Sequence, residues 1–215
     1  MKKAVILLVV QFVCTVMVFA QTGVITELTG TVELKRAGQA NFVPAKKGDS
    51  VAKDTIVSTG FKSSALIKVG SAVLTVRPLT RLSLAEISNM AGEETLNVAL
   101  QTGRVKVDVN PPAGTKASMS VQAPIATASV RGTSFEFDTQ TLTVLEGTVG
   151  FRGSQGGVMP VSAGSTSQIN ENGRAADPIV IYAAELTPQP PAGAESGFSS
   201  TFVSYGVFSL ILDLK

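Results

Sequence analysis

Apolar and polar residues alternate in short runs along most of the chain from about Val24 onward. The clearest run is Arg104–Val109, in which three valines alternate with three charged or polar side chains. Alternation with a period of two predicts β-strands that have one buried and one solvated face. We expect further strands at residues 31–35, 65–69, 73–76, 96–100, 134–138, 142–145 and 148–151.

Gly, Pro, Asn and Asp residues separate many of these runs at intervals of roughly 8–15 residues, the spacing of a sandwich, a barrel or a short solenoid. No strict repeat period accompanies them, so the pattern alone does not establish a regular solenoid. Residues 81–90 are the one stretch that could also form a helical turn. The sequence therefore predicts an all-β fold, either two packed sheets or a short β-solenoid-like sandwich of many short strands.

The first twenty residues have the layout of a secretory signal peptide. Lys2 and Lys3 form a basic start, residues 4–19 are almost entirely apolar, and Ala20 offers a small residue before a cut at Gln21. A basic start, an apolar run and a small residue before the cut are typical of exported proteins. An uncleaved membrane anchor is the alternative, because about 17 apolar residues approach the length of a spanning helix.

Cys14 is the only cysteine, and it lies inside this apolar run. Lipid attachment at Cys14 is an alternative, but Phe12 and Val13 supply no small residue before it, so we interpret it as part of the signal peptide. Because the chain contains no His, the part beyond residue 20 has neither Cys nor His. Disulfides, Ser-His-Asp or Cys-His catalysis and His or Cys metal sites are therefore excluded there.

The chain divides into four parts. After the signal peptide at residues 1–20, we expect one all-β domain over residues 21–185. Residues 186–197 are rich in proline and predict a stiff linker. Residues 198–215 are apolar again, with a pattern that suits either a strand or a helix, and such a segment should not hang free in solvent.

The charge balance argues against nucleic acid as a partner. The whole chain has 18 Lys and Arg residues against 16 Asp and Glu residues, and removal of Lys2 and Lys3 with the leader leaves 16 of each sign. Binding to phosphates requires a basic face. Lys46 and Lys47 form a pair, but Asp49 lies near them.

Acidic residues are the remaining candidates for catalysis or metal binding. Glu93 and Glu94 follow Gly92 and are interpreted as a solvated loop. Glu136 and Asp138 share one strand face and could neighbour Glu146, as a glycosidase-like carboxylate pair requires, but exposed charges on a wet face explain them equally well. The possible oxygen ligands for calcium are Asp108, Glu136, Asp138 and Glu171.

The order of several short motifs resembles the FecR domain family. The most specific match is residues 121–135, VQAPIATASVRGTSF, which is similar to the family pattern V-x-T-P-x-A-x-A-x-V-R-G-T-x-F with Ala123 in place of Thr. Coverage runs from about Gly23 to Ile169. The other segments are LTGTV at 28–32, KGDSV at 47–51, IVSTG at 56–60, SSALI at 63–67, GSAVL at 70–74, PLTRL at 78–82, LQTGRV at 100–105, EGTV at 146–149 and VSAG at 161–164.

The resemblance implies an extracytoplasmic all-β domain. In well-known members this domain receives a signal from an outer-membrane transporter and relays it through a membrane helix to a cytoplasmic segment that binds a sigma factor. Only Met1, Lys2 and Lys3 precede the apolar run here. We therefore expect a module without a cytoplasmic sigma-regulator domain.

The residues Arg131, Gly132 and Thr133 form the most specific candidate motif, with either a structural or a partner-binding role. Gly132 indicates a left-handed or closely packed backbone, and the Thr133 hydroxyl could satisfy backbone groups of a turn. Arg131 could pair with Glu146. We favour the structural role, and expect Gly132→Val to destabilise the domain more than Arg131→Ala.

Gly48 and Asp49 are a second candidate of the same kind. An aspartate after a glycine in a turn commonly bonds to backbone groups of that turn. We therefore expect Asp49 to cap its own turn in preference to binding a ligand.

These observations favour a non-enzymatic binding, signalling or scaffold module of the periplasm or cell envelope, without a cofactor. Its partner would be an envelope protein that the sequence does not identify, and exposed strand edges are possible docking places. The membrane would be contacted only through an uncleaved leader. A glycan or cell-wall binder is the alternative, although such sites use exposed aromatic faces, and only Tyr182 and Tyr205 supply Tyr or Trp.

Overall fold

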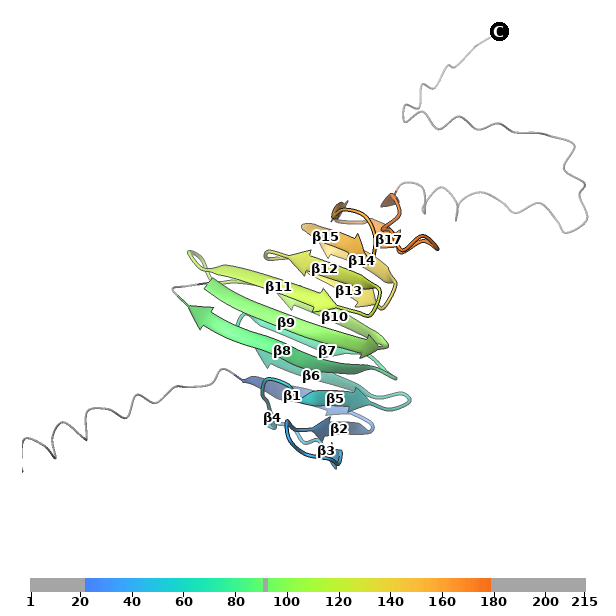
Figure 1. Ribbon diagram of the computed structural model, residues 1–215. Helices are drawn as coiled ribbons and strands as arrows, with labels where there is room; N and C mark the ends of the chain where they lie inside the picture. The colour runs from blue at the N-terminus through green and yellow to red at the C-terminus, as the bar shows by residue number, and fades with distance from the viewer. Residues whose placement is uncertain (1–21, 91–92, 179–215) are drawn as a thin grey trace, which may run out of the picture.

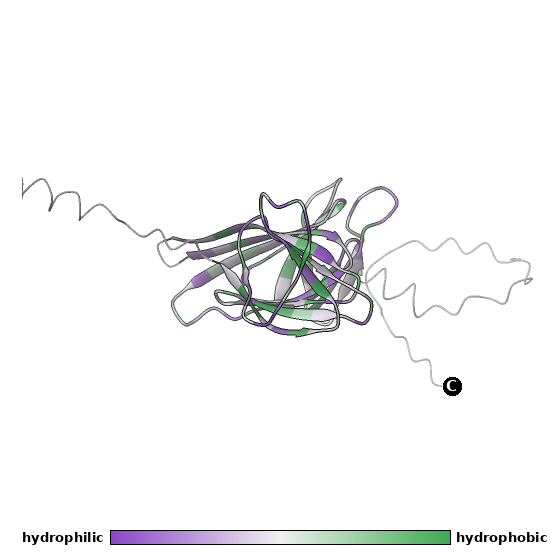
Figure 2. Cartoon of the chain, turned by 90° about the horizontal axis from the view of Figure 1, so that it is seen from below, coloured by the Kyte–Doolittle hydropathy of each residue, from purple (hydrophilic) through white to green (hydrophobic). Residues whose placement is uncertain are grey.

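The computed structural model describes residues 22–90 and 93–178. The expected signal peptide at 1–20, the linker at 186–197 and the apolar segment at 198–215 lie outside the described residues. The described part forms seventeen strands in two sheets that face each other (Figures 1 and 2). The predicted all-β fold of two packed sheets is confirmed. Within the described residues, no helix has the length and hydrophobicity needed to cross a membrane.

The eight-stranded sheet has the order β17-β14-β13-β10-β7-β6-β1-β4. Its strands are β1 (Gly23–Thr29), β4 (Ser50–Val51), β6 (Ser64–Val69), β7 (Ala72–Val76), β10 (Arg104–Val109), β13 (Ser134–Asp138), β14 (Thr141–Glu146) and β17 (Thr166–Gln168).

The nine-stranded sheet has the order β16-β15-β12-β11-β9-β8-β5-β2-β3. Its strands are β2 (Val32–Lys35), β3 (Val43–Pro44), β5 (Ile56–Thr59), β8 (Arg81–Met90), β9 (Glu93–Thr102), β11 (Lys116–Gln122), β12 (Ala126–Val130), β15 (Thr148–Gly153) and β16 (Met159–Ser162).

The chain advances steadily from one edge of the sandwich to the other while it crosses between the sheets (Figure 1). Most neighbouring strands are antiparallel. β9 and β11 are parallel, because β10 returns in the opposite sheet between them. This progression gives the sandwich the solenoid-like character expected from the sequence.

The strand directions define two ends of the sandwich. At the first, which we call the hollow end, β5, β7, β9 and β13 finish. At the opposite end, which we call the far end, β6, β8, β10 and β12 finish. We use the term arch for a short segment that crosses from one sheet to the other at either end.

The core lies between the sheets and follows the alternation of the sequence. In β10, Val105, Val107 and Val109 are buried and the residues between them face solvent. Phe137 and Phe151 come from opposite sheets and meet edge to face, with ring centroids 5.9 Å apart. Each such side chain contributes roughly 1.5–3 kcal/mol on burial. No disulfide is needed to explain how these layers hold together.

Residues 81–90 form the long strand β8, so the alternative of a helical turn is wrong. The register with β9 shifts between Leu84 and Glu86, which marks a β-bulge. The bulge adds one residue, so the apolar positions Leu84 and Ile87 are three apart instead of two. That spacing resembles a helix in the sequence although the backbone is extended.

Candidate functional site

The solvent face of the eight-stranded sheet carries rows of polar side chains across neighbouring strands. Between β10 and β13, residues of opposite charge lie directly across from each other: Arg104 with Asp138, and Lys106 with Glu136. The row continues onto β14, where Thr143 lies opposite Glu136. Opposite charges across a strand pair each contribute roughly 0.2–1 kcal/mol. This face is ordered and polar, as the alternation predicted.

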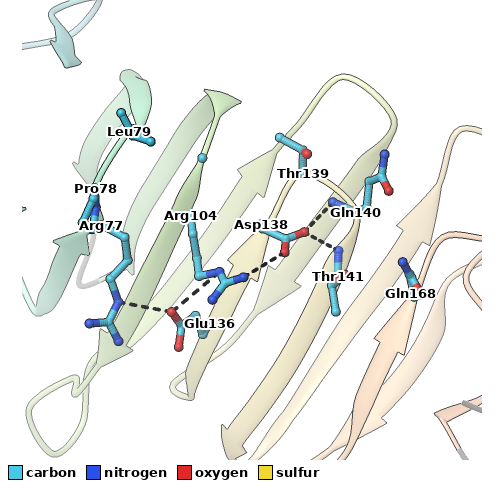
Figure 3. A pocket seen from close by; sticks show the side chains of 11 residues that line it. Arg77, Pro78, Leu79, Arg104, Glu136, Asp138, Thr139, Gln140, Thr141 and Gln168 are labelled. Carbon is cyan, nitrogen blue, oxygen red and sulfur yellow. Dashed lines mark hydrogen bonds and ion pairs between the residues drawn. The ribbon is translucent and has the colours of Figure 1, made fainter. Parts of the chain in front are cut away.

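Two arginines and two carboxylates form a network near the hollow end (Figure 3). The Arg77 Nε donates to Glu136 Oε1 at 3.1 Å. Arg104 lies between the two carboxylates, with Nε 3.9 Å from Glu136 Oε1 and Nη2 3.4 Å from Asp138 Oδ2. Both arginine side chains are about half exposed, at 44% and 55%. The network is therefore open to a ligand from solvent.

An open hollow of about 890 Å³ surrounds this network and gives the hollow end its name. Pro78 and Leu79 form its apolar side, and Gln140 and Gln168 lie on the other side (Figure 3). The remaining lining residues are Arg77, Gly103, Arg104, Glu136, Asp138, Thr139 and Thr141.

Two buried threonines fix the backbone of both arginines. Thr59 Oγ1 donates to the carbonyl of Arg77 at 2.6 Å and accepts a hydrogen bond from the N–H of Thr80 at 3.0 Å. Thr80 Oγ1 accepts from the N–H of Arg104 at 3.0 Å and lies 3.0 Å from its carbonyl. The N–H of Arg77 donates to that same carbonyl. Core hydrogen bonds thus hold the two arginines side by side.

Gly103 lets these segments approach each other. Its φ is +86°, and a Cβ at this position would overlap the side chain and backbone of Thr80 and the carbonyl of Leu79. Only glycine avoids both the left-handed strain and this overlap. Gly103 is therefore required for the geometry of the hollow.

The hydrogen-bonding capacity of the network favours an acceptor-bearing ligand. Asp138 Oδ1 already accepts from the N–H groups of Gln140 at 2.9 Å and Thr141 at 2.7 Å. In contrast, the hydrogen bond of Arg77 to Glu136 uses Nε, and its two terminal nitrogens point away from Glu136 (Figure 3). The hollow is therefore suited to binding carboxylate or other acceptor groups.

The titratable groups in the described lining of the hollow are two arginines and two carboxylates, without His, Cys, Lys or Tyr. Glu136 and Asp138 both face arginines, as the ion pairs show. Within residues 22–90 and 93–178, no three His, Cys, Asp or Glu side chains gather as metal ligands would.

The residues Arg131, Gly132 and Thr133 form an arch at the far end, between β12 of one sheet and β13 of the other. Gly132 has φ +71°, as the sequence indicated. A Cβ there would meet only Pro111 atoms at 3.7 Å, which is ordinary contact, so close packing does not require the glycine. Glycine is favoured at position 132 because the backbone there has a positive φ.

Two expectations about this motif are wrong. The Thr133 hydroxyl is buried and has no hydrogen-bond partner among the described residues, so it does not satisfy the turn. The Thr133 carbonyl instead accepts from the N–H of Val109 at 3.1 Å. Among the described ion pairs, none joins Arg131 to Glu146. Glu146 lies opposite Ser134 at a register shift. The side chains of Arg131 and Glu146 are both exposed.

Gly48 and Asp49 form the expected turn. Gly48 has φ +91°, and Asp49 Oδ2 accepts a hydrogen bond from the N–H of Lys46 at 2.8 Å. The Asp49 carbonyl also accepts from the N–H of Ile25, which attaches the turn to β1. This geometry is structural.

Other acidic residues have structural contacts as well. Glu93 and Glu94 begin β9 and do not form a solvated loop, since Glu94 Oε2 accepts from the N–H of Ser71 at 2.9 Å. Asp108 pairs with Lys106 at 3.0 Å and accepts from the Ser134 hydroxyl. Glu171 lies in an exposed turn near the last described strand.

Comparison with protein families gives one match. Residues 54–150 match the family described as FecR protein. The matched segment extends from just before β5 into β15, and it includes both arginines and both carboxylates of the hollow. The resemblance of the sequence to this family is confirmed over these residues.

Two crystal structures of a "putative anti-sigma factor" from Parabacteroides distasonis ATCC 8503 also align with the chain. Each covers 60% of this chain at 16% identity, with TM-scores of 0.46 and 0.45. The chain spans less than two thirds of those proteins, 64% and 62%. At that identity and TM-score, neither structure indicates what this chain binds. No curated protein matches the chain.

Sequence reasoning missed Arg77, Leu79 and Arg104 as site residues. Arg104 and Asp138 were visible at the ends of two predicted strands, but their pairing depends on the register of β10 with β13. Arg77 follows β7, whose adjacency to β10 is not apparent from the sequence. Leu79 lies within the segment PLTRL at 78–82, which contributes to the family resemblance, but its exposure is not apparent from the sequence. The signal that could have found the arginines is their common position at strand ends.

Proposed function

We propose that this protein is an extracytoplasmic, non-catalytic binding and signalling module whose partner docks at the hollow end. Its FecR domain, together with the signal-peptide-like leader, supports a role in the cell envelope. The observation that carries the proposal is the pair Arg77 and Arg104, fixed by buried threonines yet half exposed beside Leu79. Rigid support beneath exposed donors is a general property of recognition surfaces.

A protein partner agrees better with the hollow than a glycan. No aromatic side chain belongs to the described lining of the hollow, and Phe61 on the neighbouring arch supplies a single exposed ring, which is less than the aromatic stacking surface typical of sugar sites. Arginine beside an apolar side chain is instead enriched at protein–protein interfaces.

Photo-crosslinking in cells tests the docking place. A benzophenone amino acid replaces Leu79 at the hollow end, and a matched control replaces Arg131 at the far end, where the side chain is also exposed. We expect position 79 to give an adduct with an envelope protein, identified by mass spectrometry, and position 131 to give none. Equal adducts from both positions would place the partner elsewhere.

Two further measurements test the rest of the proposal. N-terminal sequencing of fractionated protein should find Gln21 at the start in the periplasmic fraction, whereas Met1 in the membrane fraction would indicate an anchor. Purified protein should not turn over peptidoglycan, ester or phosphoester substrates. Turnover that disappears in Glu136→Gln or Asp138→Asn, with the circular dichroism spectrum unchanged, would show that the protein is an enzyme.

A further inference from the structure

Two large apolar side chains are exposed on neighbouring arches of the hollow end. Phe61 is 74% exposed and Leu79 is 63% exposed, and among the large apolar residues that the structure describes only Val158 equals Leu79. The N–H of Leu79 donates to the Gly60 carbonyl at 3.2 Å, so the two arches are in contact. Phe61 and Leu79 are exposed and do not belong to the hydrophobic core.

Backbone strain accompanies this exposure. Lys62 has φ +52° and Leu79 has φ +56°, in the left-handed region that residues other than Gly, Asn and Asp seldom adopt. Strained positions of this kind persist where the surrounding structure enforces them, and they gather at binding sites. The strain at Leu79 occurs within an arch whose neighbouring Thr80 is buried.

The hollow beside Leu79 adds unengaged donors. Asp138 is committed to Gln140, Thr141 and Arg104, and Glu136 Oε1 lies near both arginines. The terminal nitrogens of Arg77 remain available (Figure 3). Lys62 follows Phe61 in the neighbouring arch, with its Nζ 5.5 Å from the Phe61 ring centroid. The charge at this surface is therefore complementary to a carboxylate that lies next to an apolar group.

The strand edges are poorly suited to docking by strand addition, which the sequence left open. The edge strands β3, β4, β16 and β17 have two to four residues each. Pro44 and Pro160 lie in two of them, and proline cannot donate to an added strand. The edge of β17 is partly covered, since the N–H of Ala176 donates to the Gln168 carbonyl. These edges therefore favour a partner that binds through side chains.

We propose that the hollow end binds an acidic segment of a partner protein, in which an Asp or Glu lies next to a bulky apolar residue. The carboxylate bonds to the Arg77 and Arg104 guanidinium groups, and the apolar side chain packs against Leu79 and Phe61. This inference rests on the proposed function, for which it names the chemistry of the partner. Arginine binds carboxylates in a bidentate manner, and a neighbouring apolar contact excludes water from that pair.

Selection from a random library of displayed 12-residue peptides, on the immobilised full chain, tests the chemistry. We expect enriched peptides to share an Asp or Glu within two positions of Leu, Ile, Phe or Val. Enrichment of peptides without acidic residues, or no enrichment above an unrelated β-sandwich protein, would overturn the proposal.

Affinities of one enriched peptide, labelled with fluorescein, locate the site by fluorescence anisotropy. Arg77→Gln and Arg104→Gln should each weaken binding by about tenfold or more, as expected for the loss of a charge-assisted hydrogen bond. Arg104→Lys should have an intermediate effect, because it keeps the charge but not the planar fork. Leu79→Ser should weaken binding severalfold. The matched control Arg131→Gln, at the far end, should stay within twofold.

Equal binding by wild type and Arg104→Gln would show that the acidic peptide binds elsewhere, and the proposal would be wrong. Other occupants are tested with vesicles of phosphatidylglycerol and with a synthetic peptide of residues 198–215. Either of them binding in a manner that depends on Arg104 and Leu79, while no acidic library peptide does, would assign the surface to that occupant instead. Crosslinking from position 79 that still captures an envelope protein would then preserve the proposed function and reject only this inference.

Discussion

Thr80 and Thr133 occupy matching places at opposite ends of the sandwich, each beneath a glycine of the neighbouring arch. Thr80 lies against Gly103 at the hollow end, and Thr133 lies against Gly147 at the far end. Both threonines are buried, and both glycines have positive φ. The difference is in the side-chain orientation. Thr80 directs its hydroxyl toward Gly103, whereas Thr133 directs its methyl group toward Gly147.

This difference gives the two arches different rigidity. The Thr80 hydroxyl bonds to both backbone groups of Arg104, and through Thr59 the network reaches Arg77. The Thr133 hydroxyl has no partner among the described residues, and no ion pair there holds Arg131. A buried network that is satisfied fixes its neighbours, whereas an unsatisfied hydroxyl contributes a cost. We therefore infer that the arch with Thr80 positions the two arginines, whereas the arch with Thr133 mainly connects the two sheets.

The largest expected effect is that of Gly103→Ala. The new Cβ would overlap Thr80 and add left-handed strain, at a total of about 2–5 kcal/mol of unfolding free energy. Gly114→Ala is the matched control, because Gly114 has the same φ of +86° and no atom within 4 Å of the added Cβ. It should cost only about 1 kcal/mol. Urea unfolding of both variants measures the difference, and equal losses would mean that strain alone, without overlap, explains Gly103.

Gly132→Val should cost about 2–3 kcal/mol, since a β-branched residue is strained at φ +71°. The loss should stay below that of Gly103→Ala, because Gly132 has room for a Cβ. Arg131→Ala should change stability by less than about 0.5 kcal/mol, as an exposed side chain without an ion pair would. Thermal unfolding of the two variants checks this. A large loss of thermal stability in Arg131→Ala would show that the arginine has a structural partner.

Thr80→Val and Thr133→Val compare the two hydroxyls directly, since valine has almost the same shape as threonine. Thr80→Val should cost about 1–2 kcal/mol, because the N–H of Arg104 loses its acceptor. Thr133→Val should be neutral or slightly stabilising, because the hydroxyl that it removes has no partner. The denaturant midpoints of the two variants, each compared with that of the wild type, measure these changes in stability. A similar loss in both would indicate that a water molecule satisfies Thr133.

Arg104→Gln should have only a small effect on stability. Its ion pairs are 3.4 and 3.9 Å long and about half exposed, so the change should be below about 1 kcal/mol. Raising the salt concentration should reduce the difference further. Melting curves at low and high salt measure it. A large loss of stability in Arg104→Gln would show that the arginine serves the fold more than binding.

Much of the strand pattern was predictable, because one face of each strand is buried and its residues alternate. The runs at 104–109 and 134–138 coincide with β10 and β13. The nature of β8 was not settled, since its bulge after Leu84 changes the period locally. Within the site, Glu136 and Asp138 were recognised as sharing one face. Their arginine partners were not, because those partners come from strands 30 or more positions away along the chain.

The sequence by itself determined the all-β class, the alternation of buried and solvated positions, the family resemblance and the need for a glycine at position 132. These properties depend on neighbouring residues and on local backbone conformation, which the sequence displays directly. Only the tertiary structure decided that Arg77, Arg104, Glu136 and Asp138 form one surface, and that Thr80 and Thr133 use their hydroxyls differently. Strand order, register and the crossing of arches bring these groups together, and each of them depends on contacts between distant parts of the chain.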